Sequence, residues 1–337
     1  MRTQVSLLLI FLALGASGEI QPEPGSQPIR PIYNASDLVC NCVVTSTRLL
    51  NKEQIESVGN PVFREHKIAT LKIDDFYKGP DRLREEITTH FDDQLLQEGE
   101  RVVLFLKLSG ADIYTPTDSF VGVTPISTLG PAKSSAMGLA RLEEALGEAL
   151  IHPQREDAIN AMHVLQGFDD LDPSVVSVLT GFTNSPDSDV AFAAIAVILK
   201  AKPHEGVELL AKSLDNYKGE TQPASLFSIG SQLGHVDDPQ CLETIQKLSN
   251  SRFLSIRFGA MDALRQMKRY ESIPALLARL DDPSTDIRYI AVITLAEITG
   301  RNGEYAPSMY QFDKKPNYYV GLWKASANGG YSDNRKN

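Results

Sequence analysis

Residues 273–288 read IPALLARLDDPSTDIR, and this stretch decides how the second half of the chain folds. Its apolar residues recur at helical spacing up to Leu280, a polar corner follows at Asp281-Asp282, and a second helical run opens at Thr285. Ser and Asp before the second run suit a helix start, because their side-chain oxygens accept free backbone N–H groups. The stretch therefore predicts two helices joined by a short corner.

The same polar corner recurs at a nearly constant distance along the chain. Successive corners lie 32, 31, 35 and 31 residues apart, at His152-Pro153, Asn184-Ser185, Asp215-Asn216, Asn250-Ser251 and Asp281-Asp282. Self-similarity at this period is typical of repeat proteins, in which stacked helical pairs bury the faces that one pair leaves exposed. We therefore predict an α-solenoid of about five pairs, an architecture with a long surface suited to binding.

Helical periodicity also predicts the members of each pair. They are 136–149 and 154–167, 174–182 and 189–200, 205–214 and 223–233, 240–248 and 254–267, and 273–280 and 285–298. The third pair departs most from the pattern, because Gly219-Glu220-Thr221 interrupts it.

The first half of the chain has a period of two instead, which indicates strands. Leu38, Cys40, Cys42 and Val44 are expected on one face of the first strand. Further strands are expected at 62–76, 86–91, 101–108, 112–115 and 119–123. Several short strands separated by turn residues favour a small barrel or sandwich.

The three cysteines do not form a disulfide framework. Cys40 and Cys42 stand two residues apart on one strand face and cannot easily pair with each other. We expect them to be buried as small apolar side chains. A metal or redox role, or a disulfide with Cys241 or another chain, remains an alternative.

The N-terminus has the pattern of a secretory signal peptide. Arg2 precedes an apolar run at 5–14, and the small residues Ala16-Ser17-Gly18 predict cleavage after about Gly18. A Pro-rich leader, expected to be extended, would follow at 19–35. We therefore expect a secreted or periplasmic protein.

Charge and hydropathy limit the classes of partner that we expect for this protein. The net charge of −10 argues against nucleic acid, which requires clustered Lys and Arg. The apolar run near the N-terminus is shorter than the roughly 20 residues of a membrane-spanning helix, and no later segment is apolar enough. We expect no membrane insertion and a monomer.

The β region resembles exported bacterial domains of the netrin-like type. The resemblance rests on Ser36-Asp37-Leu38-Val39, on 69–73 (ATLKI) leading into Phe76-Tyr77-Lys78-Gly79, and on 99–106 (GERVVLFL). It implies an OB-fold barrel similar to the inhibitory domain of the tissue inhibitors of metalloproteinases. Those inhibitors grip a protease zinc with a Cys-X-Cys at the mature N-terminus, whereas Cys40-Asn41-Cys42 lies about twenty residues inside the expected mature chain.

The helical region resembles the short HEAT repeats of exported and phycobilin-lyase-like bacterial proteins. Residues 273–288 and 250–257 carry the pattern, an acidic or polar corner followed by Ile-Arg. Arg257 and Arg288 take equivalent positions, 31 residues apart. The resemblance implies that this Arg ties neighbouring repeats through the acidic corner, here Asp281 or Asp282; anion binding is the alternative.

The end of the chain is rich in aromatic residues. A C-terminal cap over the last repeat is the favoured interpretation of 301–327. The alternative is a site for a partner, with Tyr310, Phe312, Tyr318, Tyr319 and Trp323 as its residues. A disordered tail is expected at 328–337.

Catalytic motifs are absent from the sequence. The six His have no metal-ligand spacing, so we predict no catalytic, cofactor-binding or metal-binding residues and no enzyme activity. We expect a scaffold that recognises a protein or peptide on its solenoid. An inhibitor or modulator of an extracellular enzyme, acting through the β region, is the alternative; a lyase-like chaperone for a tetrapyrrole is a weaker one.

Together these patterns predict a chain with a β and an α part. An OB-like antiparallel β barrel is expected at 36–127, joined near Gly130-Pro131-Ala132 to a right-handed α-solenoid at 136–300.

Overall fold

A computed structural model describes residues 28–49, 66–79, 86–92, 96–108, 113–116, 123–130, 137–152 and 154–328. Within these described ranges, six strands precede a run of helices, as the change of period predicts. The strands are β1 (Leu38–Leu49), β2 (His66–Lys78), β3 (Glu86–Asp92), β4 (Arg101–Leu108), β5 (Ile113–Pro116) and β6 (Val123–Pro125). The first five lie close to the predicted ranges. The last begins where the predicted range 119–123 ends, and residues 119–122 lie outside the described part of the chain.

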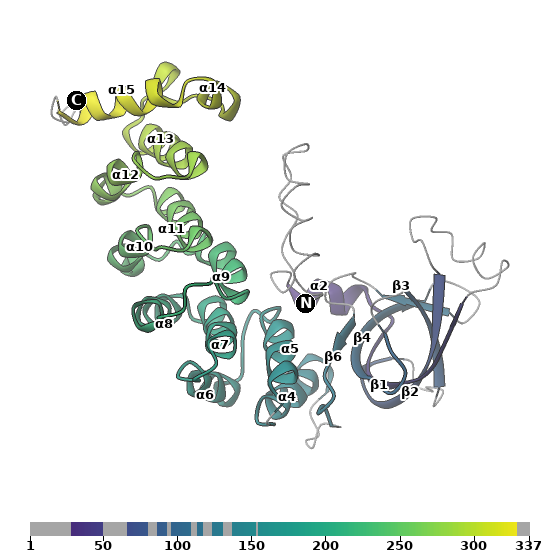
Figure 1. Cartoon of the computed structure of the whole chain (residues 1–337). Helices are drawn as coiled ribbons and strands as arrows, with labels where there is room; N and C mark the ends of the chain where they lie inside the picture. Colours follow the sequence, from purple (N-terminus) through teal and green to yellow (C-terminus); the bar gives the residue numbers. More distant parts are fainter. Residues whose placement is uncertain are drawn as a thin grey trace.

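The strands form one curved sheet in the order β1-β2-β3-β5-β4-β6 (Figure 1). The long strand β1 pairs with both β2 and β4, in antiparallel fashion on each side. Among the described strands only β3 and β5 pair in parallel. The sheet is therefore mainly antiparallel.

The predicted alternation of β1 is confirmed by its packing. Leu38, Cys40, Cys42 and Val44 are all buried in one cluster inside the curve of the sheet. Val39, on the opposite face, joins a different cluster formed with the helices. Both faces of this strand are thus covered, which explains why it reads as an apolar run.

The five predicted helical pairs are all present, including the third. They are α4 (Gly138–Leu150) with α5 (Arg155–Leu165), α6 (Pro173–Phe182) with α7 (Ser188–Ala201), α8 (Pro203–Asn216) with α9 (Ser225–Leu233), α10 (Leu242–Leu248) with α11 (Leu254–Met267), and α12 (Ile273–Arg279) with α13 (Thr285–Thr299). Short 3₁₀ turns, η2 (Pro239–Cys241) and η3 (Tyr270–Ser272), lead into α10 and α12. No described helix is long and apolar enough to cross a membrane.

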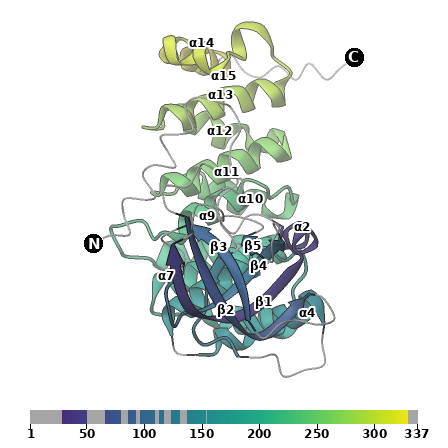
Figure 2. The same ribbon diagram turned by 90° about the vertical axis from the view of Figure 1, so that its right-hand side faces the viewer.

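The pairs stack into a solenoid-like array (Figure 1). The first helices α6, α8, α10 and α12 follow one side of the array, and the second helices α7, α9, α11 and α13 follow the side nearer the β region. Figure 2 shows the same array rising beyond the sheet as successive layers. Second helices α9 and α11 pack backbone to backbone, because Gly259 and Gly230 leave no side chain between them.

The expected side-chain cap of the second helices is present at α7 but not at α13. The Asp187 side chain accepts the N–H groups of Asp189 and Val190 at the start of α7. Ser284 makes no such contact before α13; its own N–H donates to Asp282 Oδ1 at 2.9 Å. The acidic corner, rather than the predicted cap, therefore orders this helix start.

The end of the Pro-rich leader is helical rather than extended. Helix α2 (Ile29–Ala35) carries Pro31 in its first turn, where the N–H that Pro lacks has no helical acceptor. Ile29 and Ile32 are buried against the sheet and the first helices. Tertiary burial thus overrides the local preference. The predicted signal peptide at 1–18 and the earlier part of the leader lie outside the described residues.

The sheet and the first helices share a continuous core. Val39, Phe105 and Tyr77 pack in one cluster with Leu142 and Leu146 of α4. Polar contacts cross the same boundary: the Asn41 side-chain amide donates to the Leu129 carbonyl, and Asp157 of α5 accepts from Ser127 and Thr128. The β region therefore packs directly against the first helical pair.

The aromatic end forms two further helices. These are α14 (Met309–Lys314) and α15 (Pro316–Asn328), preceded by η4 (Gly303–Tyr305), and they lie beyond α13 at the end of the array (Figure 1). The predicted cap position over the last repeat is thus filled by helices. The remainder of the predicted disordered tail, 329–337, lies outside the described residues.

Candidate functional site

A hollow lies on the second-helix side of the array, between α11 and α13. Its volume is about 420 Å³ and its walls are almost entirely charged or amide-bearing. The lining residues are Asp262, Arg265, Gln266, Lys268 and Glu297. Four of them come from one turn and the C-terminus of α11, and Glu297 comes from the facing turn of α13, so the stacking of two repeats forms the hollow.

The Arg265 guanidinium spans the hollow to Glu297. Its Nε and Nη2 donate to Glu297 Oε1 at 2.9 and 2.6 Å. This hydrogen bond is the main cause that raises the pKa of Arg265. Both side chains stay partly exposed, 43% and 31% respectively, so the pair is accessible from solvent.

The Asp262 carboxyl is the least solvated charge in the hollow. Burial raises the pKa of Asp262, and the nearby Arg265 and His235 offset this only in part. A carboxylate that loses solvation without a direct hydrogen bond from a cation destabilises the folded protein. Such perturbed groups concentrate at functional sites more than elsewhere.

Lys268 ends α11 in the left-handed conformation, with φ 49° and ψ 41°. Among the described residues it alone has a positive φ without being glycine. This conformation costs a residue with a Cβ roughly 1–2 kcal/mol. The strain turns the chain at the rim of the hollow and places a cation there.

The predicted aromatic residues separate into buried and exposed ones. Phe312 and Trp323 are fully buried, and the Trp323 indole N–H donates to the Tyr305 carbonyl. Tyr310 and Tyr318 are 69% and 49% exposed, while Tyr319 is partly buried against Phe312. The buried members serve as core of the terminal helices; only Tyr310 and Tyr318 offer large exposed surfaces.

The two repeat arginines take different partners. Arg257 forms an ion pair with Asp282 of the next corner, with Nε 2.9 Å from Oδ2, as the resemblance to HEAT repeats implies. Arg288 instead donates to the Asp282 and Pro283 carbonyls and to the Thr285 hydroxyl, all in its own corner. Both contacts satisfy protein groups, so neither guanidinium is presented as an anion site.

All three cysteines are free and buried. Cys40 and Cys42 lie inside the curve of the sheet, and the neighbouring Cys40 thiol together with burial raises the pKa of Cys42 well above its usual range. The Cys42 thiol contacts the Val102 carbonyl. These thiols are enclosed by strands on both sides.

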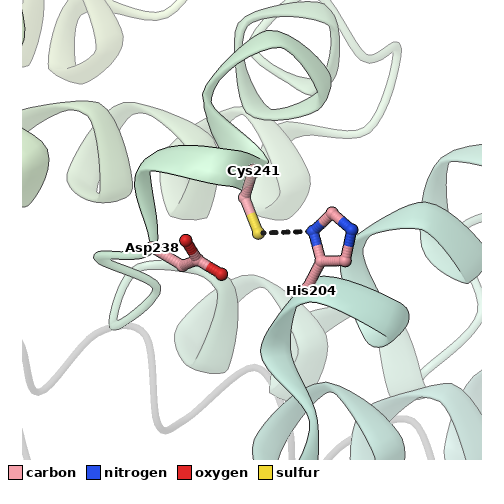
Figure 3. A group of neighbouring side chains, drawn as sticks. All are labelled: His204, Asp238 and Cys241. Carbon is pink, nitrogen blue, oxygen red and sulfur yellow. Dashed lines mark hydrogen bonds between the residues drawn. The ribbon is translucent and has the colours of Figure 1, made fainter.

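Cys241 has a different environment, which the sequence pattern did not reveal. Its sulfur lies 3.7 Å from His204 Nδ1, and the Asp238 carboxylate stands beside both (Figure 3). Within the described residues this is the single group of His, Cys and acidic side chains arranged to hold a metal ion. His204 and Cys241 are 37 residues apart, which is close to the length of one repeat. That spacing is the feature of the sequence that could have indicated that the two residues meet.

The sequence patterns likewise did not predict the hollow. Apart from Lys268, which follows the first helix, its residues are polar positions of two predicted helices, 254–267 and 285–298, and amphipathic helices expose such positions everywhere. Only the register between the two repeats brings Asp262, Arg265 and Glu297 together.

Comparison with known families supports the helical assignment. A family model described as HEAT repeats matches residues 227–296. This segment extends from α9 into α13 and contains the hollow residues Asp262, Arg265, Gln266 and Lys268; Glu297 follows directly after it. No curated protein matches the chain.

Proposed function

We propose that this chain is an exported, non-enzymatic binding protein that holds a peptide segment of its partner in the hollow between α11 and α13. The observation that carries the proposal is the hollow itself, whose mainly charged lining comes from the second helices of two adjacent repeats. HEAT repeats commonly mediate protein interactions, which agrees with this assignment.

The chemistry of the hollow indicates what it would bind. Arg265 and Lys268 suit a carboxylate, while Asp262 and Glu297 suit an ammonium or guanidinium group. A segment that carries both signs would match these groups and exchange the Arg265–Glu297 contact for intermolecular ones. Exposed charge pairs are worth little in stability, so their exchange costs little.

The proposal also includes the type of β barrel, the handedness of the solenoid and export from the cell. A netrin-like, OB-type barrel is supported by the pairing of β1 with β2 and β4 and of β5 with β3 and β4. The proposed right-handed path of the solenoid rests on the resemblance to HEAT repeats. Export rests on the signal-like sequence at 1–18. We assign the β region a supporting role, because its core is continuous with the first helical pair.

Selection of peptides against the full chain tests the binding role. Peptides from a random displayed library would be selected on the immobilised protein, and their affinities measured in solution by fluorescence anisotropy. We expect Arg265→Glu to weaken the selected peptides at least tenfold, because it reverses the charge at the centre of the hollow.

Lys247→Glu is the matched control. Lys247 is an exposed cation on α10, the first helix of the same repeat, and its side chain forms an ion pair with Glu243. This variant should bind the peptides within about twofold of the unchanged protein. Equal binding by both variants, or loss by both, would rule out the hollow as the binding site.

A further inference from the structure

We propose that His204, Asp238 and Cys241 bind a divalent transition-metal ion of the zinc type between the third and fourth repeats. All three side chains offer ligand atoms that lie within 4.8 Å of one another. The proposed peptide-binding hollow contains none of these residues.

Local structure brings the three ligands together. His204 stands in the first turn of α8, Asp238 is the N-cap of η2, and Cys241 is the last residue of η2, which leads into α10. These are the starts of first helices in successive repeats, so stacking places them side by side. In Figure 3 the imidazole and the thiol point toward each other from their two helices.

The spacing of the ligands fits tetrahedral coordination. Zinc lies about 2.3 Å from a Cys sulfur and about 2.0 Å from a His nitrogen, so the two ligand atoms of a tetrahedral site stand about 3.5 Å apart. The observed distance between His204 Nδ1 and Cys241 Sγ is 3.7 Å. A carboxylate oxygen of Asp238 lies within 4.8 Å of both atoms and supplies the third ligand.

Asp238 and Cys241 share one turn. They are three residues apart across a 3₁₀ helix, a geometry in which residues i and i+3 eclipse. Asp238 Oδ1 also accepts the Gln240 N–H at 2.9 Å, which orients the carboxylate. Outer hydrogen bonds of this kind hold metal ligands in position.

The donor types select the class of ion. A thiolate with an imidazole favours zinc and its neighbours over magnesium and calcium, which take oxygen ligands. The site is negatively charged as well, because the Asp238 and Glu208 carboxylates both lie near the Cys241 thiol. A bound cation would stabilise the thiolate and release its proton to solvent.

His204 is exposed and Cys241 is buried, so the ion would enter from the His204 side. Three protein ligands leave the fourth position to water. A metal here would also join two repeats, because its ligands come from both.

Cobalt(II) titration of the metal-free full-length protein tests the proposal. A cobalt–thiolate bond gives a charge-transfer band, and tetrahedral cobalt absorbs visible light strongly. We expect both signals to saturate at one equivalent and to be displaced by zinc. Cys241→Ser should abolish the thiolate band, which also excludes Cys40 and Cys42 as its source.

His204→Ala and Asp238→Asn test the other two ligands. Asn keeps the oxygen that accepts the Gln240 N–H, and His204 is at the surface, so both variants should retain their far-UV circular dichroism. We expect each to raise the cobalt dissociation constant at least tenfold. His152→Ala, which removes an exposed His outside the cluster, should leave it within twofold.

Two results would overturn the site. One is the absence of a cobalt–thiolate band in the unchanged protein at saturating cobalt. The other is a band that persists with unaltered affinity in His204→Ala, which would place the metal elsewhere.

Discussion

Arg141 of α4 and Asp75 of β2 form a two-point contact across the boundary between sheet and helices. Arg141 Nη2 lies 2.9 Å from Asp75 Oδ1, and Arg141 Nε donates to Oδ2 at 3.2 Å. The Asp75 side chain is 8% exposed and the Arg141 side chain 26%. The pair thus anchors the β region to the first repeat through partly desolvated charges.

Removing this pair should destabilise the protein. In Arg141→Ala the buried Asp75 carboxylate loses its guanidinium, and we expect the free energy of unfolding to fall by about 2–3 kcal/mol. This is below the roughly 3–5 kcal/mol for breaking a fully buried pair, because Arg141 keeps some solvent. Urea unfolding at neutral pH measures the change.

Arg155 supplies the matched control for Arg141. It pairs with Asp187 and Asp189 in two-point fashion but is 42% exposed. Exposed pairs contribute roughly 1 kcal/mol or less. A loss in Arg155→Ala as large as that in Arg141→Ala would show that burial of Asp75 is not what matters.

The two repeat arginines should differ in importance. Arg257→Ala leaves Asp282, whose side chain is 1% exposed, with Arg279 at 3.7 Å as its remaining cation. We expect a loss of about 3 kcal/mol. Arg288→Ala removes hydrogen bonds to carbonyls and a hydroxyl, for which we expect about 1–2 kcal/mol. Similar losses in guanidinium unfolding would contradict an inter-repeat role peculiar to Arg257.

Asp262 should make stability depend on pH in an unusual direction. Burial raises its pKa in the folded protein, so it adds stability only while protonated. That contribution is lost as pH rises from about 4, the ordinary Asp value, through the folded pKa. Asp262→Asn is therefore expected to be more stable than the unchanged protein at pH 7 and to lose this advantage below pH 4.

Urea unfolding of both proteins from pH 3 to pH 8 gives the comparison. Asp157 is the contrasting control: burial would raise its pKa, but hydrogen bonds from Thr128 and Ser127 outweigh this and lower it. Asp157→Asn should thus lose stability at pH 7, with a difference that shrinks as pH falls below about 4. A constant difference across pH for Asp262→Asn would contradict a buried, titrating carboxyl.

Gly259 should tolerate no side chain. A Cβ there would lie 2.0 Å from the Gly230 carbonyl oxygen of α9, so that Gly259→Ala must push two helices apart. We expect a cost of about 3 kcal/mol or more. Gly321→Ala, in open space on α15, should instead gain about 0.5–1 kcal/mol. Thermal unfolding distinguishes the two, and equal midpoints would be incompatible with close packing of α9 and α11.

Local patterns predicted most element boundaries. The predicted ranges 254–267 and 101–108 coincide with α11 and β4, because α11 carries a helical period of 3.6 and β4 is a short, continuous apolar run. The inward face of β1 also followed from spacing, and the resemblance to HEAT repeats implied that Arg257 contacts the acidic corner. Each of these depends on residues close in sequence or on one repeated interval.

Such patterns could not predict contacts between segments that the repeat does not relate. Helix α2 exists because Ile29 and Ile32 find a buried surface, whereas its own Pro-containing sequence argues against a helix. The parallel pairing of β3 with β5 likewise depends on how the sheet curves.

The sequence by itself determined that this protein stacks helical pairs behind a β region, since the side-chain period reports which backbone geometry buries apolar surface. Only the tertiary structure decided where chemistry gathers. Arg265 meets Glu297, and His204 meets Cys241, because one repeat stacks on the next with a particular register and tilt. Those quantities arise from side-chain packing across the repeat interface, which no single helix encodes.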